Sequence, residues 1–309
     1  MNKNRIFPIL VLAYNRPDFL RNLLVKLKIV GIDKLYISID GPKLNDSTDK
    51  QLVSECISIA EEARSWTDLT LQVSEFNLGC YIGVSSAIDW FFAFEESGII
   101  LEDDLSFNVN LLRYLSVGLE IFESQKWIGS VCGYNQWNFQ DSKIISGDMF
   151  TSKFPSSWGW ATWKDRWLQL ERNFGAPSKL SLFKTGFKNG GFSGIYHWMA
   201  IMTRLETGDL DSWAYRWLLT HFKHSWKAVL PPVNLVLNVG FREDATHTIL
   251  SSDLERRFID WDSKLKLDSI LELRDNDEYE KWLIEKVYAI PSLRQILIRF
   301  LKRFCHINK

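Results

Sequence analysis

Three adjacent carboxylates, Glu102, Asp103 and Asp104, follow the apolar run Gly98 to Leu101. Neighbouring carboxylates repel one another, so a cation or hydrogen-bond donors must offset their charge. Mg²⁺ and Mn²⁺ prefer oxygen ligands, which carboxylates and phosphates both supply. The three acids therefore predict a divalent cation held between a protein carboxylate and a diphosphate. The alternative is that Asp103 or Asp104 caps a following helix.

Alternating strands and helices in the first hundred residues must position these acids. Segments typical of strands occupy residues 7–14, 34–40, 69–75 and 98–102, and the first is a near-continuous apolar run. Helix-like segments separate the runs at residues 17–30, 47–65 and 81–96. This alternation predicts an α/β fold with a parallel sheet and right-handed crossovers.

Polar residues follow each of the four predicted strands. They are Asn15-Arg16, Asp40-Gly41, Asn77–Gly79 and Glu102–Asp104. Parallel strands end at one edge of the sheet, and open α/β sheets bind ligands at that edge. We therefore expect a ligand site built from these strand ends. The alternative is that Arg16 is a surface side chain beside a helix that begins at Pro17, and that Asp40 is a turn residue.

The composition excludes several classes of function. The 309 residues carry a net charge of −1, which provides no basic field for nucleic acid. The four cysteines form no CxxC pair, which argues against a zinc site or a disulfide framework and favours a reducing cytoplasm. The N-terminal apolar run lacks a cleavage site and is interpreted as a buried strand, and no stretch is long and apolar enough to span a bilayer. The 14 tryptophans favour stacking on ligands such as sugar rings.

The second half of the chain has a less regular pattern. Strand-like runs occupy residues 127–135 and 227–240, a helix-like segment occupies 211–222, and GGFSG at 190–194 predicts a flexible turn. Four tryptophans lie within the twelve residues SSWGWATWKDRW at 156–167. No internal repeat and no clear linker is visible, which favours one large domain.

Seven segments in one order carry a family resemblance. They are PILVLAYNRPDFLRNLL, ISIDGP, NLG…AIDWFF, GIILEDD, WGWATWKDRW, DSWAYRW and NLVLNVGFREDATHT. Together they resemble bacterial glycosyltransferases of the GT-A fold, a group distantly similar to animal N-acetylglucosaminyltransferase I. The resemblance covers about residues 5–250 and implies a Rossmann-like nucleotide-diphospho-sugar transferase fold, a mostly parallel sheet flanked by helices. It predicts a catalytic domain at 1–250, with a donor half at about 1–105 and an acceptor half at about 106–250, and a helical extension at 251–309.

The resemblance implies a donor site at the predicted strand ends. Asp104 would bind the divalent metal, Mn²⁺ or Mg²⁺, with His247 as a second ligand. The donor would be contacted by Arg16, Asp40, Asn77, Glu102, Asp103 and Arg216. A carboxylate accepts a hydrogen bond from a uracil-type N–H and a guanidinium pairs with phosphate, which suits Asp40 and Arg16. Relatives often have a basic residue directly after NLG, where this chain has Cys80.

The resemblance also implies an acceptor site. An inverting transferase needs a base for the proton of the acceptor hydroxyl, and Asp211 is the expected base. Some relatives have an acid where this chain has Ala214, and the alternative for Asp211 is the N-cap of a helix beginning near Ser212. Trp158 and Trp160 would stack on the acceptor sugar, although at least one tryptophan of this segment is expected in the core.

The C-terminal residues 291–309 form a basic amphipathic pattern with no acid after Glu285. Such a helix suits an anionic membrane surface, which would place the enzyme at the inner face of the cytoplasmic membrane with a lipid-linked glycan acceptor. The alternative is a helix that docks on the core or on a second subunit in a homodimer.

The leading hypothesis is a metal-dependent inverting glycosyltransferase that moves a sugar from a nucleotide-sugar donor to a glycan hydroxyl. By resemblance, UDP is the expected nucleotide and an N-acetylhexosamine a plausible sugar. One alternative is a nucleotidyltransferase, although AYNRPD is not the Gly-rich loop that such enzymes place after the first strand. A second alternative is a non-catalytic nucleotide-sugar or glycan-binding protein, which tryptophan richness and Ala214 would fit.

Overall fold

The computed structural model describes residues 6–108, 110–137, 149–188, 190–240 and 273–290. The strands are β1 (Ile9–Ala13), β2 (Lys34–Ile39), β3 (Asp68–Val73), β4 (Ser97–Glu102), β5 (Leu105–Phe107), β6 (Ile128–Cys132), β7 (Phe150–Ser152), β8 (Trp160–Trp163), β9 (Lys227–Leu230), β10 (Val236–Asn238) and β11 (Arg274–Asp275). The helices are α1 (Pro17–Val30), α2 (Ser47–Glu62), α3 (Gly79–Phe94), α4 (Asn110–Phe122), α5 (Lys164–Trp167), α6 (Ala176–Lys188), α7 (Gly191–Thr207), α8 (Trp213–His224) and α10 (Asp277–Trp282). Two shorter helical turns occupy Ala63–Ser65 and Leu283–Val287.

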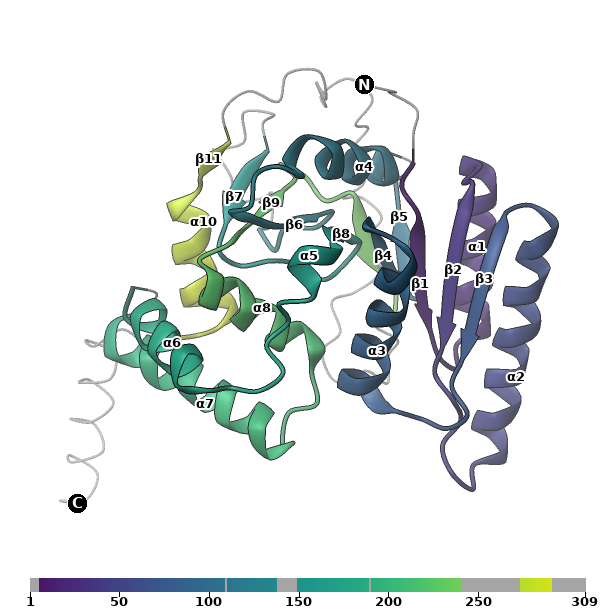
Figure 1. Cartoon of the computed structure of the whole chain (residues 1–309), viewed down its shortest axis with the longest axis horizontal. Coiled ribbons are helices and arrows are strands. Elements are labelled where there is room, and N and C mark those ends of the chain that lie inside the picture. Colours follow the sequence, from purple (N-terminus) through teal and green to yellow (C-terminus); the bar gives the residue numbers. More distant parts are fainter. Residues whose placement is uncertain (1–5, 109, 138–148, 189, 241–272, 291–309) are drawn as a thin grey trace, which may run out of the picture.

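A nine-stranded sheet forms the centre of the molecule, in the order β11-β7-β9-β6-β8-β4-β1-β2-β3 (Figure 1). The four strands predicted from the first hundred residues are β1 to β4, and they pair in parallel. The expected α/β fold with a large, mostly parallel sheet flanked by helices is therefore confirmed. Strand β8 departs from this pattern, because it is antiparallel to both of its neighbours, β4 and β6.

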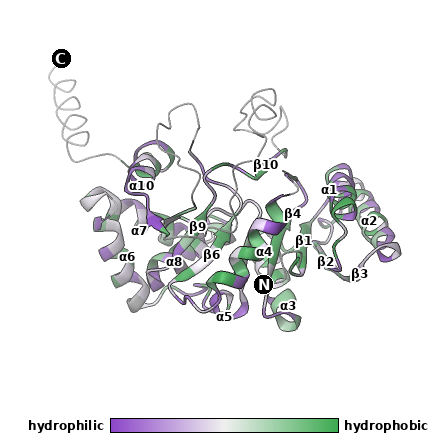
Figure 2. Cartoon of the chain, turned by 90° about the horizontal axis from the view of Figure 1, so that it is seen from above, coloured by the Kyte–Doolittle hydropathy of each residue, from purple (hydrophilic) through white to green (hydrophobic). Residues whose placement is uncertain are grey.

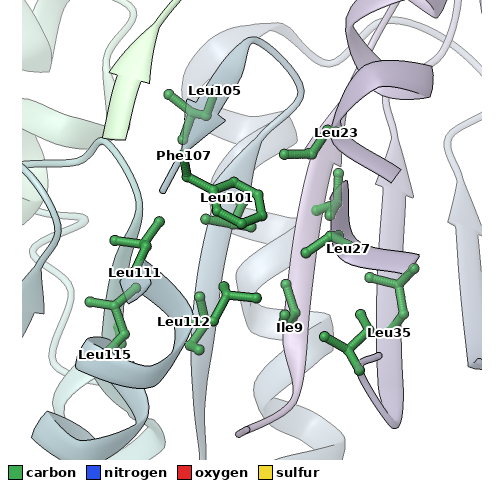
Figure 3. Close-up of a cluster of buried hydrophobic side chains, with 14 of the residues drawn as sticks. Ile9, Leu23, Leu27, Leu35, Leu101, Leu105, Phe107, Leu111, Leu112 and Leu115 are labelled. Carbon is green, nitrogen blue, oxygen red and sulfur yellow. The ribbon is translucent and has the colours of Figure 1, made fainter. Parts of the chain in front are cut away.

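Alternate residues of the central strands face opposite layers of helices. On one face α1, α2 and α4 pack against side chains such as Ile9, Leu35 and Leu101. Figure 3 shows part of this layer, with α1 and α4 contributing leucines around Ile9 and Leu101. On the other face Leu10 and Ile100 belong to a cluster that also contains residues of α3, α7 and α8. Because both faces are covered, the central strands are mostly hydrophobic, as Figure 2 shows for β1, β4, β6 and β9.

Helix α1 follows directly from its sequence. Pro17 occupies the first turn, where a missing N–H costs nothing, and the buried leucines at 20, 23, 24 and 27 form one face. The helix ends at Gly31, whose φ of 75° lies in the left-handed region. This helix therefore begins immediately after Arg16 and fixes that residue at the carboxyl end of β1.

The second half corrects three expectations. GGFSG is not simply a turn, because α7 begins at Gly191. The run 227–240 is divided at Pro231-Pro232 into β9 and β10, and β10 pairs with β5 beside the acids. The expected helical extension supplies β11 to the main sheet, so part of it belongs to the central fold. Its remaining residues, 251–272 and 291–309, lie outside the described part of the chain.

Helix α10 is tied to the sheet by its own polar contacts. The buried carboxylate of Glu280 accepts hydrogen bonds from the backbone N–H of Lys153, at 2.8 Å, and from its ammonium group, at 2.9 Å. The buried Tyr279 packs on Phe150 of β7 and on Trp137. Among the described helices, none is both long enough and apolar enough to cross a membrane.

Candidate functional site

Arg16 pairs with two of the three acids. Its Nη2 lies 2.5 Å from Oδ1 of Asp103, and its Nη1 lies 2.8 Å from Oδ2 of Asp104. Both aspartates are buried in the turn between β4 and β5, so the alternative that one of them caps a helix is wrong. The protein's own guanidinium therefore offsets part of the negative charge that the sequence left unexplained.

The arginine leaves part of that charge uncompensated. The Oδ1 atom of Asp104 is buried without a hydrogen-bond partner among the described residues. Burial raises the pKa of Asp103 to about 6 despite the attraction of Arg16. Burial, with the neighbouring charges of Asp104 and Asp103, raises the pKa of Glu102 to about 8. The acids therefore present an electrostatic deficit that a further cation would relieve.

These acids fit a divalent cation that is completed by a ligand. The described residues contain no group of three or more His, Cys, Asp or Glu placed to hold a metal by themselves. The partnerless Oδ1 of Asp104 is a free oxygen ligand, and phosphate oxygens would supply others. His247 lies outside the described residues, so its role as second ligand stays a prediction. The chain does approach Asp104 just before that segment, because Val239 N donates to the Asp104 carbonyl at 2.8 Å.

A cavity of about 280 Å³ lies at the carboxyl ends of β1 and β2 and the amino end of α3. Tyr14, Asp40, Asn77 and Cys80 are among its lining residues. The Asp40 carboxylate accepts hydrogen bonds from Asn77 Nδ2 at 2.9 Å and from the backbone N–H of Leu78 at 3.0 Å. Burial raises the pKa of Asp40. The structure thus brings Asp40 and Asn77 together, as expected from the strand ends.

Asp49 is a site residue that the sequence analysis missed. Its carboxylate accepts hydrogen bonds from the Tyr14 hydroxyl at 2.5 Å and from Asn15 Nδ2 at 2.6 Å. The backbone N–H of Lys43 donates to it at 2.6 Å. Asp49 therefore fixes the end of β1 against the loop that follows β2. An acid in the first turn of a helix is ordinary, so its sequence position gave no signal of this role.

Asp211 caps a helix, but not the expected one. Its two carboxylate oxygens accept hydrogen bonds from the backbone N–H groups of Cys80, at 2.9 Å, and Tyr81, at 2.8 Å, in the first turn of α3. The N-cap of α8 is Ser212, whose hydroxyl accepts from Tyr215 N. The expectation that Asp211 might cap the helix near Ser212 is therefore wrong, and Asp211 instead joins α3 to the segment before α8.

The position of Gly79 shows how closely Asp211 approaches α3. Gly79 has a φ of 77°, and a Cβ atom there would lie 2.9 Å from Oδ2 of Asp211. Glycine is required here because it adopts a positive φ readily and has no Cβ atom to collide with the carboxylate. The Cys80 thiol has its pKa raised to about 11 by desolvation and by the charges of Glu102 and Asp211. Glu102 and Asp211 therefore both lie near the Cys80 thiol.

A larger cavity, of about 600 Å³, is lined in part by residues that follow Asp211 in the chain. Its lining includes Ser212, Ala214, Trp158 and Trp282, together with Tyr134, Ser156, Ser157, Tyr215 and Tyr288. Of the described residues that line it, none carries a charged side chain. Aromatic faces and hydroxyl groups without charge suit a neutral sugar ring. Trp158 lines this cavity, and its role in acceptor binding stays a prediction.

Trp160 and Arg216 lie elsewhere than expected. Trp160 has no exposed surface and packs on Trp213 with the ring centroids 5.5 Å apart, so it cannot stack on a ligand in this conformation. Arg216 is buried and donates to the backbone carbonyls of Arg172, at 2.9 Å, and Leu205, at 2.8 Å. Its guanidinium also lies over the ring of Tyr81. Both side chains hold α8 in the core instead of facing the donor or the acceptor.

Comparison with models of known protein families finds no match to this chain, and comparison with curated proteins finds none either. The functional assignment therefore depends on the residues at the strand ends, on the two cavities and on Asp211 between them.

Proposed function

We propose that this chain is a metal-dependent glycosyltransferase of the GT-A type, which moves a sugar from a nucleotide-diphosphate donor to a glycan hydroxyl. The observation that carries the proposal is a buried acid cluster, only partly neutralised by Arg16, beside a cavity at the ends of parallel strands. In the sheet register, Glu102 is paired with Leu12, which lines that 280 Å³ cavity. A binding site for a nucleotide and a site for a cation would therefore be adjacent.

The donor half of the site accounts for each part of a nucleotide sugar. Asp40 would accept a hydrogen bond from the base, and Arg16 would pair with ribose or phosphate. Asp104 would hold the metal, with Asp103 and Glu102 beside the donor sugar or the ribose. When bound, Mn²⁺ or Mg²⁺ would supply positive charge that stabilises the departing diphosphate. The resemblance favours UDP as the nucleotide and an N-acetylhexosamine as the sugar.

The acceptor half supports an inverting displacement. The uncharged 600 Å³ cavity would hold a neutral acceptor sugar stacked on Trp158. The acceptor oxygen would bond to the anomeric carbon as the bond from that carbon to the diphosphate breaks, and the acceptor proton would pass to Asp211. Each carboxylate oxygen of Asp211 accepts one hydrogen bond from α3 and retains a lone pair for this proton.

A thermal-shift panel of nucleotide sugars, with and without Mn²⁺, tests the donor half of the proposal. A ligand that binds the native state raises its apparent stability, so one nucleotide class should raise the melting temperature, and more so with Mn²⁺. Asp104→Ala should remove the Mn²⁺-dependent part of the shift, whereas Glu75→Gln, at an exposed acid, should keep it. No shift with any nucleotide sugar would refute the proposal.

A second function, non-catalytic binding of a nucleotide sugar or glycan, is favoured by one observation. Both oxygens of Asp211 are used in capping α3, and the lining of the 600 Å³ cavity offers Ala214 instead of another acid. Incubation of the protein with the nucleotide sugar that binds, Mn²⁺ and no acceptor separates the two functions. Slow release of the nucleoside diphosphate indicates a transferase, whereas tight binding without release favours the binding protein.

A further inference from the structure

Helices α6 and α7 form a hairpin that exposes large apolar side chains at the end of the molecule opposite to α1 and α2 (Figure 1). Five such side chains are between 51% and 79% exposed: Leu180, Phe183, Phe187, Phe192 and Tyr196. The rings of Phe187 and Phe192 meet edge to face, with centroids 5.6 Å apart, so the apolar surface is continuous from one helix to the other. We call these five residues the hairpin patch.

The packing of the hairpin explains why these side chains point outward. The two helices meet through small residues, because a Cβ atom at Gly186 would lie 2.8 Å from Cα of Ile195. Gly186 and Gly194 are buried on the inner side, whereas Phe183 and Phe187 are exposed on the outer side. The aromatic side chains therefore contribute little to the contact between α6 and α7. Their exposure in water is unfavourable, which indicates that another apolar phase covers them.

The charges around the hairpin patch are mostly positive. Residues 176–205 contain lysines at 179, 184 and 188 and an arginine at 204, but no aspartate or glutamate. Lys179 approaches Glu206 at 3.7 Å, whereas Lys184 and Lys188 are exposed and form no ion pair within the described residues. Exposed phenylalanines and leucine alternate with exposed lysines along α6, which is the pattern of a helix lying in a membrane interface.

We propose that the hairpin patch docks the protein on an anionic lipid surface, with Phe183, Phe187 and Phe192 in the acyl boundary and Lys184 and Lys188 at the headgroups. A second copy of the chain fits this surface less well. A two-fold contact would place the patch against itself and bring the unpaired lysines of both copies together. Anionic headgroups instead supply the charge that the patch lacks.

The docking surface is close to the uncharged cavity. Trp198, on the inner side of α7, packs edge to face on Tyr288 with centroids 4.9 Å apart, and Tyr288 lines the 600 Å³ cavity. Docking through α6 and α7 would therefore bring the helix that contacts the wall of this cavity to the membrane. A substrate carried on a lipid could reach the cavity from there. The lipid-docking proposal itself does not depend on the proposed transferase function.

Flotation of the full chain with vesicles tests the proposal. Vesicles of phosphatidylcholine alone should retain little protein, and vesicles that also contain phosphatidylglycerol should retain much more, with binding that weakens as salt increases. The double change Phe187→Ser and Phe192→Ser should lower the partition coefficient at least about tenfold. The double change Lys184→Glu and Lys188→Glu should lower it by a similar factor on the anionic vesicles only.

Matched controls separate the hairpin patch from general surface effects and from the basic residues 291–309. Val25→Ser with Ile29→Ser removes two exposed apolar side chains from α1 and should leave vesicle binding unchanged. Circular dichroism melting of every variant confirms that it is folded. Wild-type flotation by both hairpin variants would overturn the proposal. Light scattering tests the alternative of a contact between copies. A dimer that is absent only in the phenylalanine variant, while vesicle flotation of that variant is unchanged, would overturn the proposal in favour of that contact.

Discussion

The raised pKa of Glu102 predicts that its replacement by glutamine stabilises the protein, and increasingly so as the pH rises. The folded-state pKa of about 8 lies above the ordinary value of 4.5, so the folded protein holds this proton more tightly than the unfolded chain does. Stability is therefore lost as the pH rises from about 4.5 to about 8, where Glu102 ionises beside Asp103 and Asp104. At about 1.4 kcal/mol per pKa unit, the loss between about pH 5 and pH 8.5 is at most about 4 kcal/mol.

Urea denaturation of the wild type and of Glu102→Gln, near pH 5 and near pH 8.5, measures this effect. The variant should differ little from the wild type at the lower pH and be more stable at the higher pH, because glutamine does not ionise. The difference between the two proteins isolates Glu102 from all other titrating groups. Glu75→Gln, at an exposed acid outside the cluster, is the matched control and should show no such divergence. If Glu102→Gln and wild type keep a constant difference across this range, the account of the acid cluster is refuted.

Four further predictions concern the residues around the site. Arg16→Met should lower the free energy of unfolding by about 2–3 kcal/mol, because two buried acids lose their cation while the arginine itself is partly exposed; an unchanged urea midpoint would contradict this. Asp49→Ala should cost about 2 kcal/mol in the same assay and weaken nucleotide binding, measured by calorimetry. Trp160→Ala should cost about 3–5 kcal/mol, whereas Trp158→Ala should mainly raise the KM for an acceptor; equal stability losses would refute this distinction. Asp211→Asn should lower kcat at least about 10²-fold and also weaken nucleotide binding, because the amide NH2 cannot accept one of the two α3 N–H bonds; retained turnover would exclude Asp211 as the base.

The parallel half of the sheet could be predicted because its signals are local. Each of β1 to β4 is a short segment rich in apolar or β-branched residues, and a helix with a recognisable start or end separates each from the next. Strand β8 could not be predicted in the same way. The segment WATW is too short, and too rich in tryptophan, for a buried strand to be distinguished from a set of rings that stacks on an acceptor sugar. Once β8 is known, its alternation assigns the tryptophans: Trp160 faces the α8 side, and Trp163 faces α4, where its Nε1 donates to the Leu119 carbonyl.

Site residues that directly follow strands could be predicted. A site residue whose hydrogen-bond partners are distant in the chain was missed. Arg16, Asp40 and the acids are brought together because parallel strands share an edge. The partners of Asp49 lie 34 and 35 residues earlier in the chain, and no pattern of spacing indicates such a contact. The Nη1 and Nη2 atoms of Arg216 donate to backbone carbonyls, which every residue type carries, so no sequence pattern indicated its burial.

Two contacts between α3 and the α8 region fix the larger cavity relative to the smaller one. Asp211 caps the amino end of α3, and the guanidinium of Arg216 packs on Tyr81 in the first turn of the same helix. The first turn of α3 also lines the smaller cavity through Cys80. A change in the smaller cavity that moves α3 must therefore displace Asp211, and with it the wall of the larger cavity that begins at Ser212. In a transferase, this arrangement would make the position of the base depend on occupancy of the donor side, because a single helix end connects the two.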